Sequence, residues 1–157
     1  MPETIPREAI LKAALELART QHGGALATMH AEDGTPYVTF VLFHLRDEGS
    51  VLFGSATRSQ HSRNIAATPE VSFLVDNRDV IRTDWTAFDR LVIEGRAALV
   101  PVDDPRYEPY LRELGARHPL SAYFTGRGEL YCIAPRRLVL MKGIDGGRQV
   151  ADFEASE

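Results

Sequence analysis

The chain has 157 residues, of which 44% are hydrophobic and 25% charged, and this length fits one domain spanning residues 1–157. It contains no apolar run long enough for a membrane-spanning helix, and its one cysteine, Cys132, excludes an internal disulfide and a multi-cysteine zinc site. The 18 basic and 22 acidic residues give a net charge of −4, which argues against a nucleic-acid partner. Because the first residues lack a signal-peptide pattern, we expect a cytoplasmic protein without membrane association.

Residues 1–23 are predicted to form an N-terminal helix that packs on the core. Pro6 suits the first turn of a helix, and Gly23-Gly24 is predicted to end it. Apolar residues recur there at helical spacing and predict one buried face, made of Leu11, Ala14, Leu15 and Ala18.

The middle of the chain has the patterns of β-strands joined by tight turns. We expect strands at residues 25–30, 37–45, 51–55, 71–75 and 88–102. Residues 37–45 read YVTFVLFHL, a nearly continuous apolar run that is typical of a central strand covered on both faces. Gly95 indicates a bulge or a close backbone approach.

Two helices and three further strands complete the expected elements. Residues 59–67 are predicted to form a short helix, and residues 76–87 an irregular surface loop. Asp104-Pro105 predicts the start of another helix, which Gly115 and His118-Pro119 would end. Strands follow at residues 130–133 and 137–142, with a short one after the turn at 143–147. The predicted fold is mainly β with flanking helices, an antiparallel barrel of six to seven strands with about three outer helices.

Common catalytic motifs are absent from the sequence. There is no dinucleotide-binding glycine motif, no Walker sequence and no nucleophile elbow. The five histidines have no spacing typical of metal ligands. We therefore predict no metal site and assign no catalytic residue.

Residues 55–64 are the most informative segment and read SATRSQHSRN. They follow an apolar strand and lead into the short helix. Hydroxyls and backbone N–H groups at a helix start bind phosphate oxygens, and Arg58 would add positive charge. The residues fit a phosphate site and, equally, a well-capped helix start exposed to solvent.

With its flanks, this segment resembles the FMN-binding split β-barrel family related to pyridoxamine 5'-phosphate oxidase. In that family the phosphate loop is followed by N-(L/I)-x-x-x-P-x-V-(S/A)-(L/F)-L, and residues 64–74 here read NIAATPEVSFL. The branch related to haem utilisation is most similar, because His61 precedes Asn64 by three residues, as in that branch. RLVIEGRA at 90–97 and RHP at 117–119 also resemble it.

The resemblance implies a set of FMN-binding positions. The strand of Thr39, Phe40 and Val41 would lie along the flavin ring, and Gly54 and Ser55 would end the next strand near the phosphate. The expected phosphate loop comprises Ser59, Gln60 and His61, with Thr57 as a further hydroxyl. Arg90 matches a position that reaches the flavin in relatives. The Lys and Arg of the true oxidases are replaced here by His61 and Gln60, so vitamin-B6 oxidation is not the expected activity.

The resemblance also implies a homodimer with FMN at the subunit interface, acting as an oxidoreductase on an unknown small molecule. Two alternatives stay open. One is a haem-binding, haem-degrading or flavin-storage protein without hydride chemistry, in which His118 would be a haem ligand by analogy, although a structural His-Pro helix end is the preferred interpretation. The other is a deazaflavin-dependent reductase.

Overall fold

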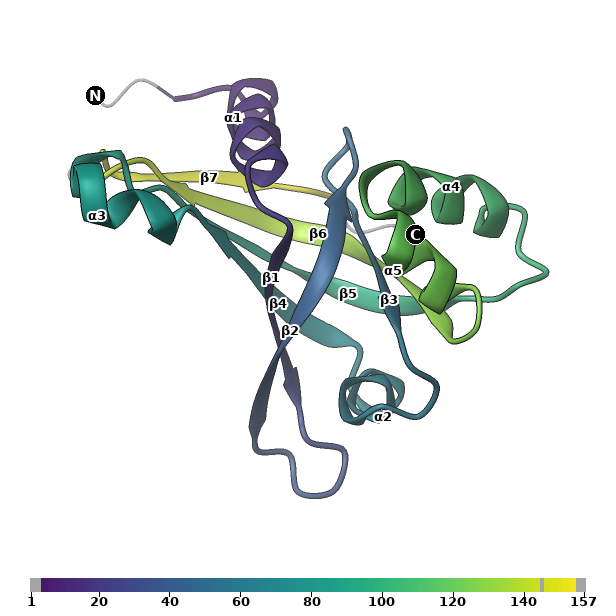
Figure 1. Ribbon diagram of the computed structural model, residues 1–157. Coiled ribbons are helices and arrows are strands. Elements are labelled where there is room, and N and C mark those ends of the chain that lie inside the picture. Colours follow the sequence, from purple (N-terminus) through teal and green to yellow (C-terminus); the bar gives the residue numbers. More distant parts are fainter. Residues whose placement is uncertain (1–3, 145, 155–157) are drawn as a thin grey trace.

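The computed structural model describes residues 4–144 and 146–154. The described residues contain seven strands, which are β1 (Gly23–Met29), β2 (Pro36–Leu45), β3 (Val51–Ser55), β4 (Glu70–Asp76), β5 (Arg90–Val100), β6 (Glu129–Met141) and β7 (Arg148–Asp152). They form one antiparallel sheet in the order β3-β2-β1-β4-β5-β6-β7, and β3 also pairs with β6, which closes six strands into a barrel (Figure 1). The predicted antiparallel barrel is confirmed.

The helices are more numerous than expected. The described residues contain α1 (Arg7–Arg19), α2 (Gln60–Ala67), α3 (Ile81–Asp84), α4 (Tyr107–Arg117) and α5 (Pro119–Thr125), with 3₁₀ turns η1 (Arg78–Val80) and η2 (Trp85–Ala87). None of these helices is long and apolar enough to cross a membrane. The segment 76–87, predicted to be irregular, is thus largely helical. Gly115 lies inside α4, and α5 follows at once because Pro119 occupies a first-turn position, where a missing N–H costs nothing.

The two strands predicted at 130–133 and 137–142 are one continuous strand, β6. On one edge of β6, its first half pairs with β3 and its second half pairs with β7. On the other edge, β5 pairs with nearly the whole length of β6. The register shifts at Glu94/Gly95, opposite Pro135, so the predicted irregularity at Gly95 is confirmed. A Cβ at Gly95 would collide with the Ala134 carbonyl oxygen. The bulge therefore lets a proline, which has no N–H to donate, lie within the sheet.

Helix α1 lies against β7, and α2 lies at the opposite end of the barrel (Figure 1). The buried residues of α1 are Ile10, Ala14, Leu17 and Ala18, so its buried face is rotated from the predicted one, and Leu11 and Leu15 are half-buried at its edge. The helix ends at Arg19 rather than at the glycines. Gly23 and Gly24 instead begin β1, where a Cβ on Gly23 would meet the ring of Phe40.

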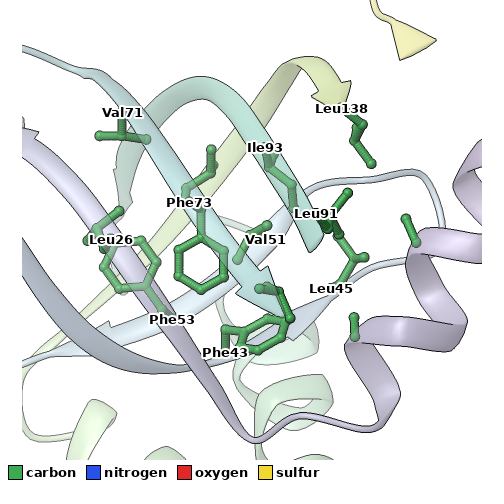
Figure 2. Packing of buried hydrophobic residues seen from close by; sticks show 14 of the residues in the cluster. Leu26, Phe43, Leu45, Val51, Phe53, Val71, Phe73, Leu91, Ile93 and Leu138 are labelled. Atoms are coloured by element: carbon green, nitrogen blue, oxygen red, sulfur yellow. The ribbon is translucent and has the colours of Figure 1, made fainter. Parts of the chain in front are cut away.

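The core fills the barrel interior. Phe43 and Phe73 cross edge-to-face with ring centroids 5.1 Å apart, and Phe53 stacks on Tyr131 at 5.2 Å. Figure 2 shows these phenylalanines among aliphatic side chains from β1, β3, β4, β5 and β6. The strands that carry the candidate site therefore rest on a rigid, closed support.

His118, between α4 and α5, is buried, and its Nε2 lies 2.9 Å from the Phe43 carbonyl oxygen of β2. This contact joins the two helices to the barrel, which confirms the structural role expected of the His-Pro pair. Burial lowers the pKa of His118 below its ordinary value of 6.5, and Arg117, His22 and His44 act in the same direction.

Acidification should therefore destabilise the fold. Because the pKa of His118 is lower in the folded state, the unfolded chain takes up the proton first as the pH falls below about 6.5. The free energy of unfolding should fall between pH 7.5 and 5.5, and this loss should shrink in His118→Gln, which does not titrate. Urea unfolding at both pH values measures this, and an equal slope in the two proteins would contradict it.

Candidate functional site

The end of β3 and the start of α2 form a tightly bonded turn. Ser59 is the N-cap of α2, and its hydroxyl accepts a hydrogen bond from the Ser62 N–H at 3.1 Å. The same hydroxyl lies 2.7 Å from that of Ser55, the last residue of β3. Capping leaves the first-turn N–H groups of Gln60 and His61 without intrahelical partners, as at any helix start.

Glu129, the first residue of β6, stabilises this turn through hydrogen bonds to its carboxylate. Its carboxylate accepts hydrogen bonds from the Arg58 N–H at 3.2 Å, the Ser62 hydroxyl at 2.9 Å and the Tyr131 hydroxyl at 3.0 Å. Arg58 has a φ of 62°, in the left-handed region that non-glycine residues rarely adopt. The carboxylate therefore supports an otherwise unfavourable backbone conformation next to the helix start.

Asn64 ties α2 to the hairpin of β1 and β2. It is fully buried; its amide donates to the Thr28 hydroxyl at 2.9 Å, and its carbonyl oxygen accepts from the Ala31 N–H at 2.9 Å. The Gln60 amide donates to the same oxygen at 2.8 Å and to Glu32 at 3.1 Å. The side chain of Gln60 is thus held by structural bonds to this hairpin.

The outward face of β2 is apolar and uncovered. Val38, Phe40 and Leu42 point outward with exposed fractions of 65%, 69% and 39%, whereas Val41 between them is buried in the core. The expectation that this strand is covered on both faces is wrong for the single chain.

A cleft of about 670 Å³ opens between this face, the end of β3 and α5; we call it the β2–β3 cleft. Its lining residues are Phe40, Val41, Leu42, Gly54, Ser55, Ala56, Thr57, His61, Ser121, Phe124, Thr125, Arg127 and Gly128. They combine apolar side chains, hydroxyls, one imidazole and one guanidinium. This described lining includes no carboxylate.

His61 contributes an unusual polar atom to the β2–β3 cleft. Its Nε2 is buried and has no hydrogen-bond partner among the described residues. Burial lowers the pKa of His61, and the nearby Glu129 carboxylate opposes this only in part. The imidazole is therefore neutral near pH 7, and one of its ring nitrogens is buried without a hydrogen-bond partner in the described part of the chain.

The cleft brings together six of the predicted residues: Phe40, Val41, Gly54, Ser55, Thr57 and His61. Ser59 and Gln60 lie beside it and serve the turn and the hairpin, and Thr39 lies next to Phe40 with its side chain on the other face of β2. Arg90 is not among the residues that line the cleft. In the sheet it lies three strands away from Leu42, across β4 and β1, which is roughly 14 Å at about 4.8 Å per strand.

Sequence reasoning missed the contribution of α5. Ser121, Phe124, Thr125 and Arg127 reach the β2–β3 cleft from this helix and the turn after it. The available signal was the sequence GRG at 126–128, which places one arginine between two glycines shortly after the aromatic pair Tyr123-Phe124.

The chain matches the family model described as pyridoxamine 5'-phosphate oxidase over residues 10–141. The chain belongs to this family. The resemblance stated from the sequence is thereby confirmed. A search of curated protein sequences finds no match.

Solved structures with the same fold include proteins named for haem binding or haem storage. A heme binding protein from Mycobacterium smegmatis has a TM-score of 0.78 at 19% identity, covering 96% of this chain and 60% of that one. HutZ, a heme storage protein from Vibrio cholerae, has a TM-score of 0.68 at 20% identity, covering 85% and 94%. A Clostridium acetobutylicum protein related to general stress protein 26 has a TM-score of 0.63 at 13% identity, covering 92% and 95%. At these identities the likeness shows the shared barrel fold.

Proposed function

We propose that the protein binds FMN in the β2–β3 cleft and acts as a flavin-dependent oxidoreductase on a small molecule. The observation that carries this proposal is the composition of that cleft. An apolar strand face, several hydroxyl groups, an imidazole and a single cation surround one space, and the described lining holds no carboxylate. FMN has the matching parts, a flat ring system and a phosphate.

The size of the cleft also suits the cofactor. Its volume of about 670 Å³ lies within the range of roughly 300–1,000 Å³ that is usual for small-molecule sites. Phe40 and Leu42 would contact the ring system, while Thr57, His61 and the N–H groups at the start of α2 would bind the phosphate. When bound, the flavin supplies the electron-transfer chemistry, and the chain's residues bind and orient it.

We further propose that two chains form a homodimer through the outward face of β2. Val38, Phe40 and Leu42 form an exposed apolar row, of the kind that marks interaction surfaces. Arg90 does not line the β2–β3 cleft of its own chain. In the proposed dimer it would contribute to the partner's cleft, the role that the family resemblance implies for it.

Val38→Asp should shift the protein from dimer to monomer. Burying an unpaired carboxylate in an apolar interface costs several kcal/mol, so the dissociation constant should rise at least about tenfold. Sedimentation velocity reports the change against twice the chain mass of 17.5 kDa. Val102→Asp, at a position 75% exposed and outside β2, is the matched control. A wild-type monomer, or equal effects of both variants, would contradict the proposed interface.

The flavin proposal is tested by adding FMN to the purified protein, removing free ligand by desalting and recording the absorbance spectrum. We expect flavin bands with about one FMN per chain, and mass spectrometry of the released ligand should return FMN. A protein that retains no flavin under these conditions would refute the proposal.

Haem binding is a second candidate because His61 lines a largely apolar cleft and has a buried ring nitrogen without a partner among the described residues, and histidine is a common haem ligand. Two structural neighbours, named as a heme binding protein and a heme storage protein, support testing it. A Soret band on haem titration that is lost in His61→Ala and kept in His118→Gln would favour haem. His118 itself is buried and bonded to Phe43, which makes it a poor ligand.

A further inference from the structure

We propose that Arg127 supplies the positive charge that binds the ligand's phosphate, a role that the sequence assigned to Arg58 and the loop beside it. This inference rests on the proposed binding of FMN in the β2–β3 cleft. Arg127 would thus be a specificity residue outside the expected phosphate loop, on the turn between α5 and β6.

Close backbone packing fixes the position of Arg127. A Cβ on Gly54 of β3 would collide with the Thr125 hydroxyl, and a Cβ on Gly128 would collide with the Ser55 carbonyl oxygen. The residues on either side of Arg127 are thus pressed against the end of β3. Helix α5 lies beside β3 in Figure 1, in keeping with this packing. Arg127 is therefore held at the same edge of the cleft as Ser55 and Thr57.

Arg127 is also the one charged residue among those lining the cleft. Its guanidinium lies 3.8 Å from the centroid of the Tyr123 ring and donates one hydrogen bond, of 3.3 Å, to the Tyr123 carbonyl oxygen. No ion pair with a carboxylate forms within the described residues. Since a guanidinium has five N–H donors, several remain for a phosphate.

The two arginines of the segment 55–64 face a different space. Arg58 and Arg63 line a second cleft of about 400 Å³ between α2 and β5, together with the carboxylate of Glu129; we call it the α2–β5 cleft. The guanidinium of Arg63 already has protein partners. It donates hydrogen bonds to the Arg58 carbonyl oxygen and to the Gln60 side chain, and it lies 3.6 Å from a carboxylate oxygen of Glu32. Nearby carboxylates make this second cleft less suited to a dianion.

The test compares FMN with riboflavin, which lacks the phosphate. Dissociation constants for both are measured by flavin fluorescence in the wild type and in Arg127→Gln, Arg127→Lys and Arg58→Gln. Losing a charge-assisted hydrogen bond should lower the FMN-to-riboflavin affinity ratio about tenfold or more in Arg127→Gln. Arg127→Lys should recover much of the ratio, and Arg58→Gln should leave it unchanged.

Each other outcome overturns the inference in a distinct way. An unchanged ratio in Arg127→Gln, or an equal loss for both flavins, would mean that Arg127 does not contact the phosphate. A reduced ratio in Arg58→Gln alone would return the role to the loop. If the wild type binds neither flavin, the proposed function fails as well, and the inference fails with it.

Discussion

Ala56→Trp should lower FMN affinity at least about tenfold, because overpacking a fitted space costs roughly 1–3 kcal/mol and each 1.4 kcal/mol is a factor of ten. Ala56 is exposed and lines the β2–β3 cleft between Ser55 and Thr57. An indole there would occupy space that the ligand needs, without disturbing the core. Flavin fluorescence titration of the variant and the wild type measures the effect.

Ala66→Trp is the matched control for this experiment. Ala66 is also exposed, but it lines the α2–β5 cleft and not the β2–β3 cleft. Its replacement should leave FMN affinity within a factor of about two, since changes at exposed positions outside a site usually have small effects. If Ala66→Trp weakened binding and Ala56→Trp did not, FMN would bind in the α2–β5 cleft, and the proposed site in the β2–β3 cleft would be wrong.

Asn64→Ala should reduce the free energy of unfolding by roughly 3 kcal/mol, because it removes a fully buried side chain and leaves the Thr28 hydroxyl and the Ala31 N–H without their partner. The Asn64 amide bonds to Thr28 and to the Ala31 N–H, and it is fully buried. Its loss should also free α2 from the β1–β2 hairpin and weaken FMN binding. Urea unfolding gives the first effect and a flavin titration the second.

Arg63→Ala removes the neighbouring exposed side chain and provides the comparison. Its loss should change the free energy of unfolding by no more than about 0.5–1 kcal/mol, the usual range for exposed residues. Equal destabilisation by the two substitutions would show that α2 is not held chiefly through Asn64.

Local sequence patterns predicted most strands. Alternation of apolar and polar residues indicates an extended segment with one buried face, and turn residues indicate where such a segment ends. The continuity of β6 was not predicted, since Pro135 reads as a break. The pairing of Gly95 with Pro135 at the bulge is a long-range feature that one segment does not reveal. Helix α5 was missed for a similar reason, because His118-Pro119 ends one helix and begins another.

The candidate site was predictable where the family pattern covers it. Phe40, Gly54, Ser55, Thr57 and His61 do line one cleft. The direction of each side chain could not be predicted from its position in the sequence. Two examples are Gln60, which faces the β1–β2 hairpin, and Arg58, which faces the α2–β5 cleft. Arg127 comes from a segment some 70 residues further along the chain, and only the close packing of Gly54 and Gly128 brings it to the cleft.

The most direct test of the central claim is an amide NMR titration of the isotope-labelled protein with FMN. We expect chemical-shift changes concentrated at residues 40–42, 54–57 and 125–128 and at His61, with little change at residues 97–99 beside the α2–β5 cleft. Shift changes confined to residues 97–99 and Glu129, or none at all at saturating FMN, would contradict binding in the β2–β3 cleft.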